Sequence, residues 1–232
     1  MSTPLEPPPT ANPNNVVERA NGSRATYSPG IETADKVLVT AERLFAQRGF
    51  DGVTLREIGR HAGQRNTNVV SYYFGSKIGV VAAIPEFRLP AYSERQQELL
   101  AQVVPGQGDE TMIGYARALV MPVVESMEQG TWWPGFLAQL QMNRKMRVAM
   151  VGRIGPFMSS HSGLEHTLRR ELWVLLTPAE RRLRFDAILT MIVHTVAARQ
   201  TDLAAGDTGG LATRGFQSQL IETVAGSLRS KT

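Results

Sequence analysis

Amide, hydroxyl and basic side chains gather in one short segment of this sequence. They are Gln64, Arg65, Asn66, Thr67, Asn68, Ser71 and Lys77. Arginine can donate two hydrogen bonds to guanine, asparagine and glutamine can pair with adenine, and lysine or hydroxyl groups can contact phosphate. No acidic residue occurs between Ile58 and Pro85, so the segment carries a local excess of positive charge. Such an excess is what neutralisation of a phosphate backbone requires.

The motifs of common enzymes are absent from the sequence. It contains no glycine-rich phosphate loop, no HExxH and no Gly-x-Ser-x-Gly. The absence of cysteine excludes thiol nucleophiles and cysteine-based metal sites. His161 and His166 are five residues apart and fall on different helix faces, and His194 lies in an apolar segment. We therefore predict no enzyme, no metal site and no cofactor, while a helical enzyme that uses residues 110–200 stays open as an alternative.

Three predicted helices position the polar segment. The first carries an apolar face that consists of Val37, Leu38, Ala41, Leu44 and Phe45, and Gly49 ends it. Thr54 and Glu57 form a capping box at the start of a second helix, Leu55 to Ala62, which Gly63 ends. A third short helix spans residues 67–74, and Ser76 begins a fourth at Lys77. Two short helices joined by a tight turn are typical of a helix-turn-helix, whose second helix enters the DNA major groove.

Helical periodicity continues to the end of the chain. We expect helices at Glu94–Val103 (after interruptions at Pro85 and Pro90), Met112–Met127 (broken by Pro122), Gly135–Met150, Leu164–Leu176, Pro178–Arg199 and Gly215–Leu228. No segment shows the two-residue alternation of a strand, so the predicted fold class is all-α. Residues 1–30 hold six of the thirteen prolines and few large apolar side chains, which predicts a disordered tail.

Composition restricts the location and the partners of the protein. The chain has 232 residues, a net charge of +4 and 42% hydrophobic residues, as expected for a soluble globular protein. No apolar run approaches the roughly 18 residues of a membrane span, and the first residues do not resemble a secretory signal. We therefore expect a cytoplasmic protein that does not enter a membrane. The mild basic excess permits a nucleic-acid partner without requiring one.

The segment from residue 41 to residue 77 resembles the DNA-binding domain of the TetR family of bacterial transcriptional regulators. The resemblance is carried by AERLFAQRGF at Ala41–Phe50, TLREIGRHAG at Thr54–Gly63 and YYFGSK at Tyr72–Lys77, in the order and spacing of the family. Between Gly63 and Phe74 the chain has one residue more than the commonest form of the motif. It is similar there to the family branch with Ala-Gly-Gln-Arg-Asn before the aromatic pair.

The resemblance implies a helix-turn-helix domain at residues 31–77 and a larger helical effector-binding and dimerisation domain at residues 78–232. It implies a repressor that binds a palindromic double-stranded DNA operator as a homodimer and is released by a small, mainly apolar effector. The DNA-binding residues that it implies are Thr54, Arg56, Arg65, Asn66, Thr67, Asn68, Tyr72 and Lys77. A constitutive DNA-binding protein without an effector stays open as a second alternative.

Apolar side chains of the larger domain allow two further expectations. An effector pocket between helices would be lined by Tyr115, Trp132, Trp133, Phe136, Met142, Met146 and Phe157, although ordinary core packing explains the same pattern. The predicted dimer interface comprises two stripes on the last two helices: Phe185, Ile188, Ile192 and Val196, and Phe216, Leu220, Val224 and Leu228. The alternative is that both stripes close the core of the chain itself.

Overall fold

The fold is seen in a computed structural model of the chain. The structure describes residues 29–66, 68–104, 106, 108–150, 164, 166–168, 170, 172–207 and 209–229. All regular structure within these ranges is helical, which confirms the predicted fold class. The predicted tail, residues 1–30, lies outside the described residues except for its last two, where the first helix begins.

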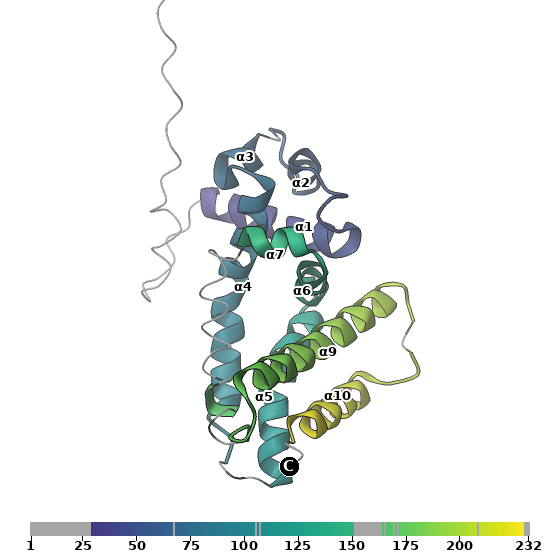
Figure 1. The fold of residues 1–232 in the computed structure, drawn as a ribbon. Helices are drawn as coiled ribbons and strands as arrows, with labels where there is room; N and C mark the ends of the chain where they lie inside the picture. Colours follow the sequence, from purple (N-terminus) through teal and green to yellow (C-terminus); the bar gives the residue numbers. More distant parts are fainter. Residues whose placement is uncertain are drawn as a thin grey trace, which may run out of the picture.

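Three helices pack together at one end of the molecule (Figure 1). They are α1 (Pro29–Arg48), α2 (Leu55–His61) and α3 (Val69–Phe74). The predicted apolar face of α1 is buried at all five positions. The predicted capping box at Thr54 is present, and it fixes the start of α2.

The long helix α4 (Lys77–Leu100) connects this end of the molecule to the rest. The expected interruptions at Pro85 and Pro90 are wrong, because α4 runs through both prolines, and α5 (Asp109–Glu128) likewise runs through Pro122. A proline inside a helix costs about 3 kcal/mol through a lost hydrogen bond and a steric clash. Burial of one large apolar side chain contributes roughly 1.5–3 kcal/mol, and α4 buries several, among them Ile84 and Leu89. Core packing on both sides of each proline therefore outweighs the local penalty.

The helix expected at Gly135–Met150 is instead two helices, α6 (Trp133–Met142) and α7 (Arg144–Met150). Asn143 separates them with an extended backbone, and its side-chain oxygen accepts a hydrogen bond from the N–H of Met146 at 2.9 Å. Asparagine favours such local bonds over a helix interior, which explains the break. The two last helices are α9 (Pro178–Ala204) and α10 (Thr213–Leu228), close to their expected bounds, and the described residues between 164 and 170 are helical.

The molecule has two apolar cores. The lower core joins α5, α9 and α10 with the second half of α4 and residues around Trp173. The upper core joins α1, α2, α3 and the start of α4 with α6 and α7. Phe45 and Phe50 pack there against Phe136, with ring centroids 6.5 and 5.8 Å apart, and Trp133 stacks on Phe136 at 5.7 Å. The helix-turn-helix therefore shares its core with helices from the second half of the chain, beyond the predicted boundary at residue 77.

None of the described helices is both long enough and apolar enough to cross a membrane.

Candidate nucleic-acid interface

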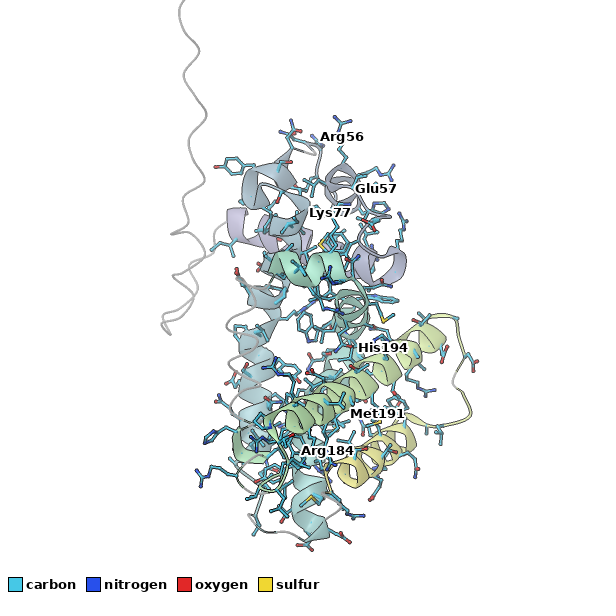
Figure 2. All side chains as sticks on the ribbon, in the orientation of Figure 1. Arg56, Glu57, Lys77, Arg184, Met191 and His194 are labelled. Carbon is cyan, nitrogen blue, oxygen red and sulfur yellow. The ribbon has the colours of Figure 1, made fainter. Side chains whose placement is uncertain are left out.

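Helix α2 is fixed at its start by the capping box and along its inner face by burial. The Thr54 hydroxyl accepts a hydrogen bond from the Glu57 N–H at 3.2 Å, and the Glu57 carboxylate accepts one from the Thr54 N–H at 2.9 Å. Ile58 is completely buried. Arg56 and Arg60 are consequently exposed, and Figure 2 shows Arg56 at the outer end of the molecule.

Glu57 is an acidic residue within this basic surface, and its charge is engaged. Hydrogen bonds from the backbone and the hydroxyl of Thr54 lower the pKa of its carboxyl below the ordinary value, with Arg48 and Arg60 adding to the effect. A guanidinium nitrogen of Arg48 lies 3.5 Å from the carboxylate. The negative charge is thus directed toward α1 and the start of α2, and it leaves the outer side of α2 basic.

A tight turn follows α2. Gly63 has a φ of +72°, a conformation that glycine adopts without strain. Arg65, Asn66 and Asn68 are exposed, and the Asn66 side-chain oxygen accepts a hydrogen bond from the Asn68 N–H at 3.0 Å. Helix α3 begins at Val69, two residues later than expected. The turn therefore exposes the guanidinium of Arg65 and the side-chain amide of Asn68 just before α3.

Helix α3 presents aromatic and hydroxyl groups outward. Val70 is buried and anchors the helix, whereas Ser71, Tyr72 and Tyr73 are exposed. Tyr72 is 76% exposed, and its ring meets that of Tyr73 edge to face at 5.3 Å. Two phenol hydroxyls held on a short anchored helix can donate hydrogen bonds to phosphate oxygens.

The junction between α3 and α4 is tightly packed. The Ser76 hydroxyl caps α4 by accepting from the Gly79 N–H at 3.1 Å. A Cβ atom at Gly79 would lie 1.9 Å from the Phe74 carbonyl oxygen, so only glycine fits there. The Lys77 ammonium donates a hydrogen bond to the Phe50 carbonyl oxygen at 2.9 Å. These contacts hold α3 at a fixed angle to α1 and α4.

The structure brings most of the predicted DNA-binding residues to one end of the molecule. Thr54, Arg56, Arg65, Asn66, Asn68 and Tyr72 are exposed there, and Thr67 lies outside the described residues. Lys77 differs from the expectation, because it is half-buried and its ammonium bonds the loop between α1 and α2.

Some exposed residues of this end were not among the predicted contacts. They include Arg60, His61, Ser71 and Tyr73. The His61 Nδ1 lies 2.8 Å from the Glu57 carbonyl oxygen and must donate, because a carbonyl only accepts. Its Nε2 is then the ring nitrogen left for an outside partner. The sequence could have indicated this bond, because His61 lies four residues after Glu57 on a helix whose start is fixed by the capping box.

Residues 37–84 match the family model described as "Bacterial regulatory proteins, tetR family". This range covers all of α2 and α3, most of α1 and the start of α4, which are the helices of the surface described above. Over these helices the chain matches the TetR family.

One curated relative of known sequence matches part of the chain. The "Probable HTH-type transcriptional regulator YttP" of Bacillus subtilis (strain 168) is 29% identical over 83 residues, which span 36% of this chain and 40% of that protein. The match thus covers less than half of this curated relative.

Two solved structures show that the similarity of fold extends over most of the chain. The fatty acid degradation regulator FadR from Bacillus halodurans has 13% identity and a TM-score of 0.57, with 89% of this chain and 100% of that chain covered. The TetR family regulator PfmR from Thermus thermophilus has 15% identity and a TM-score of 0.56, with 90% and 99% covered. TetR-family proteins are transcriptional regulators and not enzymes, which sets aside the alternative of a helical enzyme.

The predicted effector-pocket residues are divided between the two cores and the surface of the described chain. Tyr115 is buried in the lower core, whereas Trp133, Phe136 and Met146 are buried in the upper core. Met142 is 75% exposed, Trp132 is half-buried, and Phe157 lies outside the described residues. Trp133, Phe136 and Met146 belong to the packed core that also contains Phe45 and Phe50, and both of these rings contact Phe136.

The predicted dimer stripes need a correction. Phe185, Ile188, Ile192, Val196, Leu220, Val224 and Leu228 are all buried in the lower core, and Phe216 is half-buried against it. Side chains buried inside one chain cannot contact a partner, so the stripes close the core of the chain itself. A dimer that uses α9 and α10 must employ their outer faces.

A cleft of about 260 Å³ lies between the helix-turn-helix domain and the second half of the chain. Its lining consists of Ala46 from α1, Trp132, Gly135, Ala138 and Gln139 from the region of α6, and His194, Ala197, Ala198 and Thr201 from α9. No charged residue is among them. The Nε2 atom of His194 is buried and has no hydrogen-bond partner in the described structure, and Figure 2 shows this residue on α9.

Proposed function

We propose that this protein is a transcriptional regulator that inserts the turn before α3, and α3 itself, into the major groove of DNA. The observation that carries the proposal is the exposed surface of α2, the turn and α3, which presents cations, amides and phenols on a scaffold anchored by Ile58 and Val70. In this arrangement Arg65 and Asn68 meet base edges, and Arg56 and Tyr72 contact phosphates.

The proposal includes a homodimer and a near-palindromic operator. A two-fold dimer presents two copies of α3, so the half-sites lie roughly 34 Å apart, one turn of DNA, or a multiple of that distance. We propose that the protein acts as a repressor, because a dimer bound to DNA near a promoter sterically blocks the binding of other proteins there.

A small, uncharged and mainly apolar effector would release the DNA. The cleft between α1, α6 and α9 supports this step, because it touches both the helix-turn-helix domain, through Ala46, and the second half of the chain. A compound bound there changes the distance between α1 and α9. A tenfold loss of DNA affinity needs about 1.4 kcal/mol of difference between its binding to the free and the DNA-bound geometry.

A gel shift with the DNA upstream of the protein's own gene tests the proposal. We expect a retarded complex with the wild-type protein, and loss of that complex when a panel of small uncharged aromatic compounds is added. Retardation that no compound reverses would favour a constitutive DNA-binding protein. Absence of retardation with this and other genomic fragments, at low salt, would contradict DNA binding itself.

A further inference from the structure

Two buried polar atoms lie beside the cleft between α1, α6 and α9 without a hydrogen-bond partner in the described part of the chain. They are the Nε2 atom of His194 and the Oε1 atom of Gln200, both on α9. His194 lines the cleft directly (Figure 2). Gln200 is only 7% exposed, and its Oε1 atom would lie 3.4 Å from a Cβ atom at Gly135, a lining residue of α6. Both atoms are therefore next to the same cleft.

The orientation of the Gln200 amide is fixed by its nitrogen. The Nε2 atom donates a hydrogen bond to the Thr131 carbonyl oxygen. Because a carbonyl oxygen only accepts, the nitrogen must be the atom that faces Thr131, and the oxygen must be the atom without a partner. A buried acceptor without a partner is costly, because it has lost its bonds to water and gained none in return. The Gln200 oxygen therefore requires a donor that the described chain does not supply.

The size and lining of the cleft restrict the molecule that supplies this donor. The volume of about 260 Å³ is below the roughly 300–1,000 Å³ of sites for drug-sized ligands, which indicates a single ring with one substituent. No aspartate, glutamate, lysine or arginine is among the lining residues, so a charged molecule would lose its hydration without compensation. Trp132 is the largest apolar side chain of the lining, and the alanines around it leave room for a flat ring.

We propose that the cleft binds a small neutral aromatic carboxamide, with its ring beside Trp132 and its amide between His194 and Gln200. This inference rests on the effector of the proposed function and names its chemical class. One N–H of the carboxamide donates to the Gln200 oxygen. The His194 Nε2 atom pairs with the remaining N–H or with the carbonyl oxygen, according to which ring nitrogen carries the proton, because a primary carboxamide both donates and accepts.

A carboxamide fits these two positions better than a hydroxyl group does. His194 and Gln200 are six residues apart, which is about 9 Å along α9. A carboxamide carries its donors and its acceptor on different atoms, so it can reach two separated side chains at once. A hydroxyl group has both functions on a single oxygen. One amide substituent can thus satisfy both buried atoms.

Binding requires α9 to move slightly away from α6, because both polar atoms are buried beneath the surface of the cleft. In the closed cleft the two atoms stay without partners, and the ligand forms its hydrogen bonds only in the opened geometry. It consequently binds the opened geometry in preference to the closed one, as an effector must. Ala46 of α1 lines the same cleft, so the movement reaches the helix-turn-helix domain.

Titration calorimetry on the full-length protein without DNA tests the ligand class with two probes of matched shape. Benzamide carries the N–H donors, and acetophenone has a methyl group in place of the amide nitrogen. We expect benzamide to bind about tenfold more tightly or better, because a site built around a buried acceptor rejects an analogue without the donor. Equal affinities of the two probes would overturn the inference. So would the absence of benzamide binding, which is the result expected if water alone fills the cleft.

Two variants locate the bound amide. Gln200→Leu should remove the preference for benzamide, whereas Gln219→Leu, the same change at an exposed position of α10, should retain it. Ala197→Leu fills the cleft without removing a side-chain hydrogen bond and should abolish benzamide binding, whereas Ala91→Leu, at an exposed position of α4, should not. If Gln200→Leu fails to fold, Ala197→Leu decides alone. A preference for benzamide that survives either cleft change in a folded protein would overturn the inference.

A gel shift with the upstream DNA separates failure of this inference from failure of the proposed function. A protein that retards the DNA but binds no benzamide overturns the carboxamide site and leaves the DNA-binding regulator in place. A protein that binds benzamide through Gln200 but retards no DNA has the reverse meaning. Where both occur, saturating benzamide should weaken the DNA complex, and an unchanged complex would overturn the role of the carboxamide as effector.

Discussion

At the scale of single residues, sequence discrimination is expected to reside in the turn before α3. Arg65 and Asn68 are exposed, and no hydrogen bond within the described residues occupies the Asn68 side chain. Replacement of either residue by alanine should weaken binding to the operator by about 1–3 kcal/mol, as expected for a lost base contact. Binding to random DNA should change much less.

Fluorescence anisotropy with operator and random duplexes measures both affinities. Arg43→Ala, which removes the same charge from an exposed position of α1, is the matched control and should leave the ratio of the two affinities unchanged. Equal losses on both duplexes for Arg65→Ala and Asn68→Ala would show that these side chains do not contact bases.

The capping box of α2 makes a pH-dependent contribution to stability. Thr54→Ala should cost about 1 kcal/mol at neutral pH, through loss of the cap. Because the pKa of Glu57 in the folded protein lies below its ordinary value, the folded state stabilises the ionised carboxylate. Its contribution is complete above the unfolded pKa and is lost as the pH falls through the folded pKa. The difference in urea midpoint between wild type and Thr54→Ala should accordingly shrink at acid pH, and a constant difference would contradict this account.

Residue-scale features were predictable where their cause is local. The capping box depends on two residues three positions apart, and the sequence alone located it. The role of Lys77 was not predictable in the same way, because its partner is the Phe50 carbonyl, 27 residues earlier.

At the scale of helices, the angle of α3 depends on the close approach of α4 to the end of α3. Gly79→Ala would place a Cβ atom 1.9 Å from the Phe74 carbonyl oxygen, a backbone atom that cannot move without moving α3. We expect a stability loss of about 1–3 kcal/mol, as for overpacked cores, with a larger loss of operator affinity than the stability change explains. Gly226→Ala in α10 is the control, because nothing lies within 4 Å of its Cβ position, and it should be neutral or stabilising. Wild-type thermal stability and affinity in Gly79→Ala would refute the close approach.

A buried ion pair ties three helices together. Glu42 of α1 is 1% exposed, accepts two hydrogen bonds from Arg88 of α4 at 2.6 and 3.0 Å, and accepts a third from the Trp132 N–H at the start of α6. Arg88→Met leaves a buried carboxylate without its cation and should cost about 3–5 kcal/mol. The double variant Glu42→Gln, Arg88→Met removes both charges and should be the more stable of the two in urea unfolding. If Arg88→Met proved more stable than the double variant, the Glu42 carboxylate would not be shielded from solvent by burial.

The helix pattern was predictable from periodicity and caps, but its breaks were not. Pro85 and Pro90 predict interruptions by local rules, and burial on both sides of them keeps α4 continuous. The sequence also favoured the most apolar stripe of α9 as the dimer interface, since periodicity alone does not tell an internal core from an external one.

At the scale of the whole molecule, the shared upper core offers a route from the cleft to the DNA. Trp133 and Phe136 pack against Phe45 and Phe50, so a displacement of α6 reaches α1 through direct contact. The sequence could not indicate this route, because the aromatic residues of the two groups are more than 80 positions apart. Filling the cleft with Ala138→Leu should abolish any effector response while operator binding persists. An effector response that persists in this variant, measured by anisotropy, would place the effector elsewhere.

Hydroxyl-radical footprinting on the upstream DNA tests the central claim most directly, namely that two copies of α3 read one operator from the same side. We predict two protected blocks related by a near-palindrome, with centres about 10 base pairs, or a multiple of that, apart on one face of the duplex. Arg65→Ala should lose both blocks at a protein concentration that saturates the wild type. A single protected block, uniform protection without blocks, or a footprint that Arg65→Ala leaves intact would contradict the claim.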